Sequence, residues 1–386
     1  MAAERQGEGP TDDASGETPA GGQRPPAAPQ VRHSTACTPE QIAARGSRKP
    51  VNLALQGGGA HGAFSWGVLD KLLEDDRLAL DAVSATSAGA MNAVAMAYGI
   101  SVGGREGARA KLDEFWREVS RSGALWSPIR SMPWDSWVGS SPFGTGTSAA
   151  YQWFSAMTNM VSPYQFNPLG INPLKEVLER VIDFQRLRDC RQATRLFISA
   201  TNVRTGKIRV FENGEIGVEA VLASACLPML FQAVEVDGEH FWDGGYMGNP
   251  AIFPLIYRGA STDVVIVHTN PIVRDGVPTT SGEILDRMNE ISFNSSLMRE
   301  MRAIAFVSRL LEAETLDRER YARMFIHAIR NDAAMARYGL ESKLDLDWSF
   351  LQRLRELGRS TAAQWLEQHF DDVGTRGSVD LAATYL

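Results

Sequence analysis

Ser87 has the surroundings of a serine nucleophile. It stands at the centre of the run ATSAG at residues 85–89, where small neighbours allow a sharp strand-to-helix turn that lifts the hydroxyl clear of a sheet. The usual motif is G-x-S-x-G, and here Ala85 takes the first place while Gly89 keeps the last. The ordinary alternative is that Ser87 caps a helix, a position that serine often fills. Ser84 is a weaker candidate because it lacks a flanking glycine.

A glycine-rich run upstream of Ser87 could hold negative charge. It comprises Gly57, Gly58, Gly59, Ala60, His61 and Gly62. Successive N–H groups in such a turn at the start of a helix form a pocket for an anion, because glycine tolerates positive φ. Two functional occupants are considered, a dinucleotide pyrophosphate and the oxyanion of an acyl-transfer intermediate. A purely structural turn is the third interpretation.

The segment between the two motifs indicates which of the two occupants to expect. A dinucleotide-binding unit has an acidic residue that closes its second strand. Here the corresponding segment, residues 80–84, carries Asp81 near its beginning instead. Together with Ser87 immediately downstream, this arrangement favours acyl transfer over nucleotide binding.

A serine nucleophile needs a base, and the sequence offers a carboxylate for that role. Asp243 is followed by Gly244 and Gly245, which let the backbone turn tightly beside it. An ordinary Asp-Gly turn is the alternative interpretation. The histidines carry no recognisable triad signature, and we expect His327 and His369 on helices. The six histidines are His33, His61, His240, His268, His327 and His369.

An α/β framework must position these residues. Apolar runs at 51–55 and 80–84 predict buried strands, and each is followed by a turn and a helical pattern, at 63–74 and 90–98. Two consecutive strand-turn-helix units imply a parallel sheet with both faces covered. Further strands are expected at 196–201, 207–212 and 263–268, and further helices at 173–182, 299–314 and 351–370.

Composition divides the chain into segments. Residues 1–49 are rich in Gly, Pro, Ala and polar residues, which predicts a disordered tail. Residues 50–275 carry all the motifs and are expected to form the catalytic domain. Within it, about 126–166 is an aromatic-rich insertion, interpreted either as a lid or acyl-chain surface or as ordinary core packing. Residues 276–386 are helical and charged, which predicts a helical C-terminal extension.

Charge and hydropathy exclude several classes of protein. The 386 residues carry a net charge of -7 with scattered basic residues, which argues against nucleic-acid binding. A mean hydropathy of -0.19 argues against a membrane-embedded chain. The first residues lack the pattern of a signal peptide, so a cytoplasmic location is expected. The three cysteines have no C-x-x-C spacing, which indicates neither a zinc site nor a disulfide framework.

Taken in order, the motifs resemble the signature of patatin-like phospholipases. The resemblance is carried by QGGGAHGA at 56–63, ATSAG at 85–89 and DGG at 243–245. The run ASACLP at 223–228 is similar to the family's serine-and-proline segment. The similarity covers residues 51 to about 270.

The resemblance implies a three-layer α/β/α fold with a mainly parallel sheet and a lipid acyl hydrolase of the phospholipase A or lysophospholipase type. It implies a Ser-Asp dyad without histidine, an acyl-enzyme intermediate, and neither metal nor cofactor. Ser87 matches the nucleophile, Asp243 the base, and Gly57 to Ala60 the oxyanion hole. His61 stands where the family often has Arg or Lys, and Ala85 stands where glycine is usual.

Two other functions fit the same motifs. One is a general carboxylesterase or thioesterase that acts on soluble acyl substrates. The other is a catalytically silent lipid-binding protein, which Ala85 would favour. The expected partner is a lipid or phospholipid substrate, with contact at a membrane or lipid-droplet surface and no nucleic acid. The oligomeric state stays open.

Overall fold

A computed structural model describes residues 48–126, 160–189, 194–317 and 321–386 of the chain. The predicted tail, up to residue 47, lies outside the described residues. So do residues 127–159, which make up most of the predicted aromatic-rich insertion.

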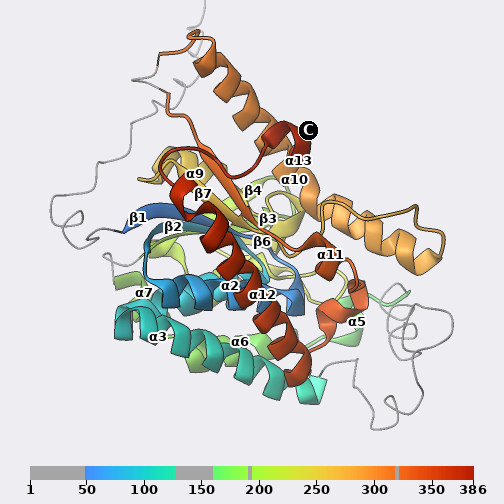
Figure 1. Ribbon diagram of the computed structural model, residues 1–386. Helices are drawn as coiled ribbons and strands as arrows, with labels where there is room; N and C mark the ends of the chain where they lie inside the picture. Colours follow the sequence, from blue (N-terminus) through green and yellow to red (C-terminus); the bar gives the residue numbers. More distant parts are fainter. Residues whose placement is uncertain (1–47, 127–159, 190–193, 318–320) are drawn as a thin grey trace, which may run out of the picture. The chain divides into compact units, whose positions relative to one another are not determined.

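The described residues form one eight-stranded sheet (Figure 1). Its strands are β1 (Lys49–Leu55), β2 (Leu78–Thr86), β3 (Arg195–Asn202), β4 (Ile208–Glu212), β5 (Val234–Val236), β6 (Glu239–Asp243), β7 (Asp263–Val267) and β8 (Phe325–Ile329). The order is β5-β6-β3-β2-β1-β7-β8, with β4 paired to β3. Strands β3, β2, β1, β7 and β8 are parallel, whereas β4, β5 and β6 pair antiparallel. The predicted mainly parallel sheet is confirmed.

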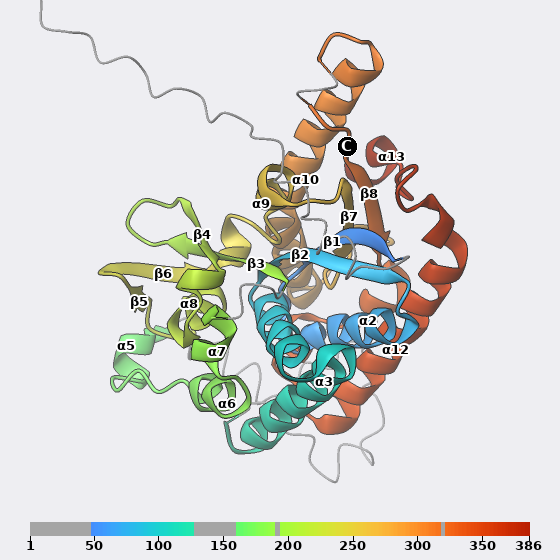
Figure 2. The ribbon, with the colours of Figure 1, turned by 90° about the vertical axis from the view of Figure 1, so that its left-hand side faces the viewer.

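Helices cover both faces of this sheet (Figures 1 and 2). One face packs against α2 (Gly62–Asp75), α3 (Ala88–Trp126) and α12 (Trp348–His369). The other packs against α9 (Phe253–Arg258), α10 (Ser281–Glu312) and α13 (Leu381–Tyr385). The predicted three-layer α/β/α architecture is therefore confirmed.

Shorter helices connect these layers. They are α5 (Pro163–Phe166), α6 (Pro173–Val181), α7 (Phe184–Asp189), α8 (Val218–Ser224) and α11 (Asp332–Met335), with 3-10 turns η1 (Gly59–His61), η2 (Asn213–Glu215), η3 (Gly244–Tyr246), η4 (Leu340–Leu344) and η5 (Phe370–Asp372). Helix α3 breaks at Gly104, which has a φ of 63°. Within the described part of the chain, no helix combines the length and apolar character needed to cross a bilayer.

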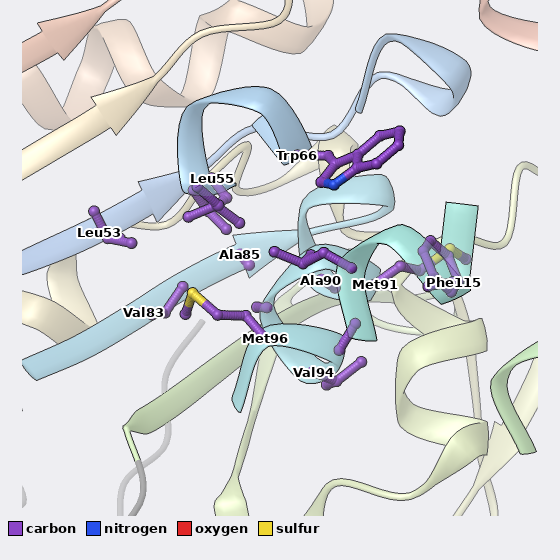
Figure 3. Packing of buried hydrophobic residues seen from close by; sticks show 14 of the residues in the cluster. Leu53, Leu55, Trp66, Val83, Ala85, Ala90, Met91, Val94, Met96 and Phe115 are labelled. Carbon is purple, nitrogen blue, oxygen red and sulfur yellow. The ribbon is translucent and has the colours of Figure 1, made fainter. Parts of the chain in front are cut away.

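Strand β1 shows how the two faces are made. Leu53 and Leu55 belong to the same core as Trp66 of α2 and Phe115 of α3, which is drawn in Figure 3. Ala54, between them, belongs to the second core, together with residues of α10. Successive side chains of a strand point to opposite faces, so a strand buried on both faces reads as a continuous apolar run.

The C-terminal region is helical, as predicted, and it also completes the sheet. Strand β8 lies parallel to β7 at the sheet edge. His327, expected on a helix, lies in β8 instead, where its buried Nε2 is 3.0 Å from Asp263 Oδ1. That expectation was wrong because a five-residue apolar run is too short for its period to separate strand from helix. The predicted boundary at residue 275 stays a prediction.

Helices α2 and α12 touch backbone to backbone. A methyl group on Gly67 would overlap the backbone carbonyl of Arg355, and one on Gly358 would overlap the carbonyl of Phe64. Beside this contact, buried Asp70 of α2 accepts a hydrogen bond of 2.9 Å from the Arg355 guanidinium. Two glycines and the ion pairs of buried Asp70 with Arg355 and Arg359 therefore fix the C-terminal helix to the core.

We expect Gly358→Ala to lower the free energy of unfolding by about 1 to 3 kcal/mol, because overpacking forces backbone shifts. Urea unfolding followed by circular dichroism measures this change. Gly282→Ala is the matched control, since a methyl there meets no neighbour and should leave stability unchanged or slightly raised. Equal stability of the two variants would show that α2 and α12 can separate at no cost.

Candidate active site

The sequence motifs meet at the carboxyl edge of the sheet. Gly57 follows β1 and Ser87 follows β2, and these strands are parallel neighbours, so their ends lie side by side. Asp243 ends β6, where it pairs with Ala200 near the end of β3. Ligands of α/β sheets bind outside the carboxyl ends of the strands. The structure thus brings the candidate nucleophile, base and glycine turn to one place.

Ser87 occupies a strained turn between β2 and α3. Its φ is 56°, in the left-handed region, which costs a residue other than glycine on the order of 1 to 3 kcal/mol. The Ser87 N–H donates to Ser224 Oγ at 2.9 Å, and the Met91 N–H donates to the Ser87 carbonyl at 3.2 Å. These bonds hold the strained conformation in place, with the side chain 8% exposed.

The turn requires small neighbours on two sides. A Cβ on Gly57 would lie 2.6 Å from Ser87 Cβ, and one on Gly89 would lie 2.5 Å from the Leu55 carbonyl oxygen. Ala85, which departs from the usual glycine, is fully buried in the core shown in Figure 3. Its methyl group therefore packs into the core and does not crowd the turn.

Close approach also fixes the other glycines of the motifs. A methyl on Gly244 would overlap the Ser199 carbonyl, and a Cβ on Gly245 would lie 2.5 Å from the Phe293 ring. A Cβ on Gly62 would lie 2.7 Å from the first side chain of α3. These glycines allow the turns to pack tightly around the candidate site.

The glycine turn presents N–H groups, but Gly57 does not provide one of them. The Gly57 N–H donates to Asn249 Oδ1 at 2.7 Å, so the predicted role of Gly57 as an oxyanion donor is not supported. Gly58, Gly59 and Ala60 lie at the start of η1, where the first N–H groups have no partner within the helix. Gly59 has a φ of 58°, which favours glycine.

Buried amide side chains hold this turn from behind. Gln56 Oε1 accepts from the backbone N–H groups of Thr269 and Asn270 at 3.0 and 3.1 Å, and Gln56 Nε2 donates to Asn294 Oδ1 at 2.9 Å. Asn270 Nδ2 donates to the Gly57 carbonyl at 2.9 Å. Sequence reasoning assigned these amides no role. The sequence signal that could have indicated a role was the polar pair of Thr269 and Asn270, which follows shortly after buried β7.

Asp243 is fully buried, and one of its oxygens has no donor. Oδ1 accepts from the Gly245 N–H at 2.7 Å, while Oδ2 has no hydrogen-bond partner among the described residues. Burial raises the pKa of Asp243 to about 6, against lowering by the Gly245 N–H, the Ser87 hydroxyl and the Lys343 ammonium. Ser87 therefore lies within interaction range of the carboxyl without a formed hydrogen bond. A carboxylate in that position can accept the serine proton.

His61 is neutral. Burial, and then the charge of Lys343, lower its pKa to about 3. Its Nε2 lies 2.7 Å from Ser342 Oγ, and the Ser342 hydroxyl donates to the Gly339 carbonyl at 2.6 Å. Since that hydroxyl has one proton, it accepts from His61, which assigns the imidazole proton to Nε2. His61 therefore brings no positive charge to the glycine turn at neutral pH.

The other described histidines do not act on Ser87. His268 Nε2 is 2.9 Å from Tyr385 Oη, and His369 Nδ1 is 3.0 Å from Asp372 Oδ2. His240 is exposed on β6, and His33 lies outside the described residues. No hydrogen bond joins any described histidine to Ser87.

Metal and thiol chemistry gain no support from the described side chains. Across the described ranges, no group of three or more His, Cys, Asp and Glu residues could hold a metal ion. Cys226 is buried, and burial raises the pKa of its thiol to about 12. A thiol in that state is not a nucleophile at neutral pH.

A comparison with known protein families finds a match over the segment that carries Gly57, Ser87 and Asp243. The model of a family described as patatin-like phospholipase matches residues 53–256, more than half of the chain. Among solved structures, VipD from Legionella pneumophila is similar, with 16% identity, a TM-score of 0.38, and coverage of 84% of this chain and 67% of that one. The type III effector protein ExoU shows 17% identity, a TM-score of 0.31, and coverage of 83% and 54%. No match was found among curated proteins.

We expect Asn249→Ala to leave the Gly57 N–H buried without an acceptor, which costs about 1 to 3 kcal/mol of stability. It should also slow the labelling of Ser87 by a fluorophosphonate probe by at least about tenfold, because the turn beside Ser87 shifts. Labelling rates and thermal unfolding measure the two effects.

Asn172→Ala is the matched control for Asn249→Ala. It removes another asparagine acceptor, 3.1 Å from the Leu174 N–H at the start of α6, at a cost of about 1 kcal/mol. It should leave labelling unchanged. If both variants label Ser87 at the wild-type rate, Asn249 does not hold the turn.

Proposed function

The chain belongs to the patatin-like phospholipase family, and we propose that it hydrolyses lipid carboxylic esters with Ser87 as nucleophile and Asp243 as base. The observation that carries the proposal is the placement of a strained serine within interaction range of a fully buried carboxyl whose Oδ2 has no donor among the described residues. The substrate class is a lipid or phospholipid ester, as for a phospholipase A or lysophospholipase.

Acylation would use both groups in one step. Ser87 Oγ attacks the ester carbonyl carbon while its proton passes to Asp243 Oδ2. The charge that develops on the carbonyl oxygen is stabilised by the N–H groups of Gly58, Gly59 and Ala60, as in other oxyanion pockets. Collapse of the tetrahedral intermediate breaks the ester C–O bond, and the leaving alcohol takes the proton from Asp243. The product is an acyl-enzyme on Ser87.

Deacylation would reverse the roles with water as nucleophile. Asp243 accepts a proton from the attacking water, and the same N–H groups stabilise the second tetrahedral intermediate. The Ser87–acyl bond breaks and Ser87 recovers its proton from Asp243. A fatty acid is released and both side chains return to their first state.

Burial is what lets an aspartate act as this base. An exposed aspartate, with a pKa near 3.9, is a poor base for an alcohol. The buried carboxyl has its pKa raised to about 6, which increases its proton affinity while leaving it mostly ionised at neutral pH. The N–H pocket carries the rest, since each such donor is typically worth about 10²- to 10³-fold in rate.

Two alternative functions would use the same fold. A carboxylesterase or thioesterase on soluble substrates would use the same dyad. A silent lipid-binding protein loses its one favourable feature, because the Ala85 methyl lies in the core and leaves the Ser87 turn intact.

Exposed apolar side chains beside the site favour a lipid surface over a soluble substrate. Tyr246 and Met247, on the turn after Asp243, are 40% and 38% exposed. Helix α10 lies beside this turn, since the ring centres of its Phe293 and of Tyr246 are 5.9 Å apart. Four residues on one face of α10 are 43 to 62% exposed: Ile284, Leu285, Met288 and Ile291. We name these four the α10 apolar face. Contiguous exposed apolar surface of this kind marks binding surfaces, and we propose that it contacts aggregated lipid.

Replacing Ser87 by Ala should reduce hydrolysis of a short-chain ester and of phospholipid to below a few per cent, because the variant lacks the hydroxyl that forms the acyl-enzyme in this proposal. Asp243→Asn keeps the shape but cannot accept the proton, so turnover should fall about 10²- to 10⁴-fold. Steady-state kinetics on both substrates measures the losses.

His240→Ala is the control for Asp243→Asn on the same strand, since His240 is exposed. It should retain wild-type kinetics. A protein that is folded by circular dichroism but cleaves no ester in a broad panel would be a lipid-binding protein instead. Hydrolysis of short soluble esters alone would favour the carboxylesterase alternative.

We expect the double variant Leu285→Ser, Met288→Ser to lose about tenfold or more of its activity on phosphatidylcholine vesicles, because each side chain gives up apolar burial. Its activity on a soluble short-chain ester should be unchanged. Phe306→Ser is the control, since Phe306 is 55% exposed on the same helix but about 27 Å from Met288 along its axis. Equal losses on both substrates would contradict a lipid contact.

A further inference from the structure

Lys343 is a partly buried cation that lies outside the family-matched segment. It belongs to η4, which packs against the glycine turn η1, and the Lys343 carbonyl fills the space where Gly59 would carry a side chain. Its Nζ donates to Asn270 Oδ1 at 2.8 Å and to Asn289 Oδ1 at 2.6 Å. The ammonium also lies 5.2 Å from the centre of the Phe293 ring. Two amide oxygens and one aromatic ring therefore surround the Lys343 ammonium.

The Asn270 amide links this ammonium to the glycine turn. An ammonium has only donors, so the oxygen of the Asn270 amide must face it. The amide nitrogen then points the other way, where Asn270 Nδ2 donates to the Gly57 carbonyl at 2.9 Å. Lys343 therefore fixes the orientation of the side chain that holds the turn beside Ser87.

We propose that Lys343 is a positioning residue of the active site, supplying the positive charge that neutral His61 lacks and favouring the ionised forms of Asp243 and of the oxyanion. The inference rests on the proposed ester hydrolysis and adds the source of charge that the catalytic motifs leave open. It also makes the C-terminal region a part of the site, since Lys343 lies well beyond residue 256.

The titratable groups that face Lys343 come from three elements. Asp286 and Glu290 on α10 and Asp243 at the end of β6 all favour its charged form. Glu290 also pairs with Arg274 and Arg287, at 2.6 and 3.2 Å, which reduces the negative charge that it offers. His61 on η1 is neutral. Burial outweighs these carboxylates and lowers the pKa of Lys343 to about 8.

Two titrations then bracket the active pH range. Asp243 is the base only when ionised, so activity should fall as the pH drops through about 6. Lys343 supports Asp243 only when protonated, so activity should fall as the pH rises through about 8. A bell-shaped dependence of kcat/KM reports such pairs of groups in the free enzyme.

The experiment measures kcat/KM for a soluble short-chain ester from about pH 5 to about pH 10 in the full-length protein. In Lys343→Met the acid limb should move to higher pH by about one unit, so that kcat/KM falls about tenfold at pH values below the limb. The alkaline limb of the same variant should disappear. In Lys343→Arg, which stays charged, the acid limb should remain and the alkaline limb should disappear. Lys175→Met, at an exposed lysine, should keep the wild-type profile.

The outcomes separate this inference from the proposed function. Unchanged limbs in Lys343→Met, or a retained alkaline limb in Lys343→Arg, overturn the role of Lys343 even if rates fall. If Lys343→Met does not fold, Lys343→Arg and the wild type decide. If no ester is cleaved, the proposed function fails, and carbon-13 NMR of the Asp243 carboxyl decides the charge coupling. Its pKa should be higher in Lys343→Met than in the wild type, and an equal pKa overturns the coupling.

Discussion

The glycine turn after β1 and the serine turn after β2 lie so close that neither tolerates one more methyl group between them. Neighbouring strands of a sheet are about 4.8 Å apart, and at their ends Gly57 and Ser87 meet with no side chain on the first. The proposed N–H pocket and the hydroxyl therefore stand at a fixed spacing. Asn249 and Gln56 hold one side of the contact, and Ser224 holds the other. The two strands and these three side chains hold the turns at this distance.

Around that contact the interior is polar, and hydrogen bonds join several of its buried amides. Gln56, Asn270 and Asn294 satisfy one another and the backbone. Inside a protein such networks are strong when complete and costly when broken. Two ionisable groups lie nearby, of which Asp243 is fully buried and Lys343 is partly buried. Among the described residues, no group donates to Oδ2 of Asp243, which is the acceptor in the proposed chemistry.

Local patterns predicted much of this structure. The strands that carry Gly57 and Ser87 are short apolar runs closed by small residues, and the order of the motifs gives a parallel sheet. His327 was misplaced because five residues do not reveal a period. The use of the Gly57 N–H and the role of Lys343 depend on Asn249 and Asn270, which approach the turn only after folding. Long-range polar contacts of this kind leave no spacing in the sequence.

The distribution of the site along the chain also sets the order in which it can be completed during translation. Ser87 and the glycine turn leave the ribosome before β8, η4 and α12. At about 5 to 20 residues per second, the interval between Ser87 and Lys343 is on the order of 10 to 50 s. A nascent chain in that interval holds the serine without the parts that close around it. A ribosome stopped by a premature stop codon before residue 343 would release Ser87 and the glycine turn without the lysine that we propose as their source of positive charge.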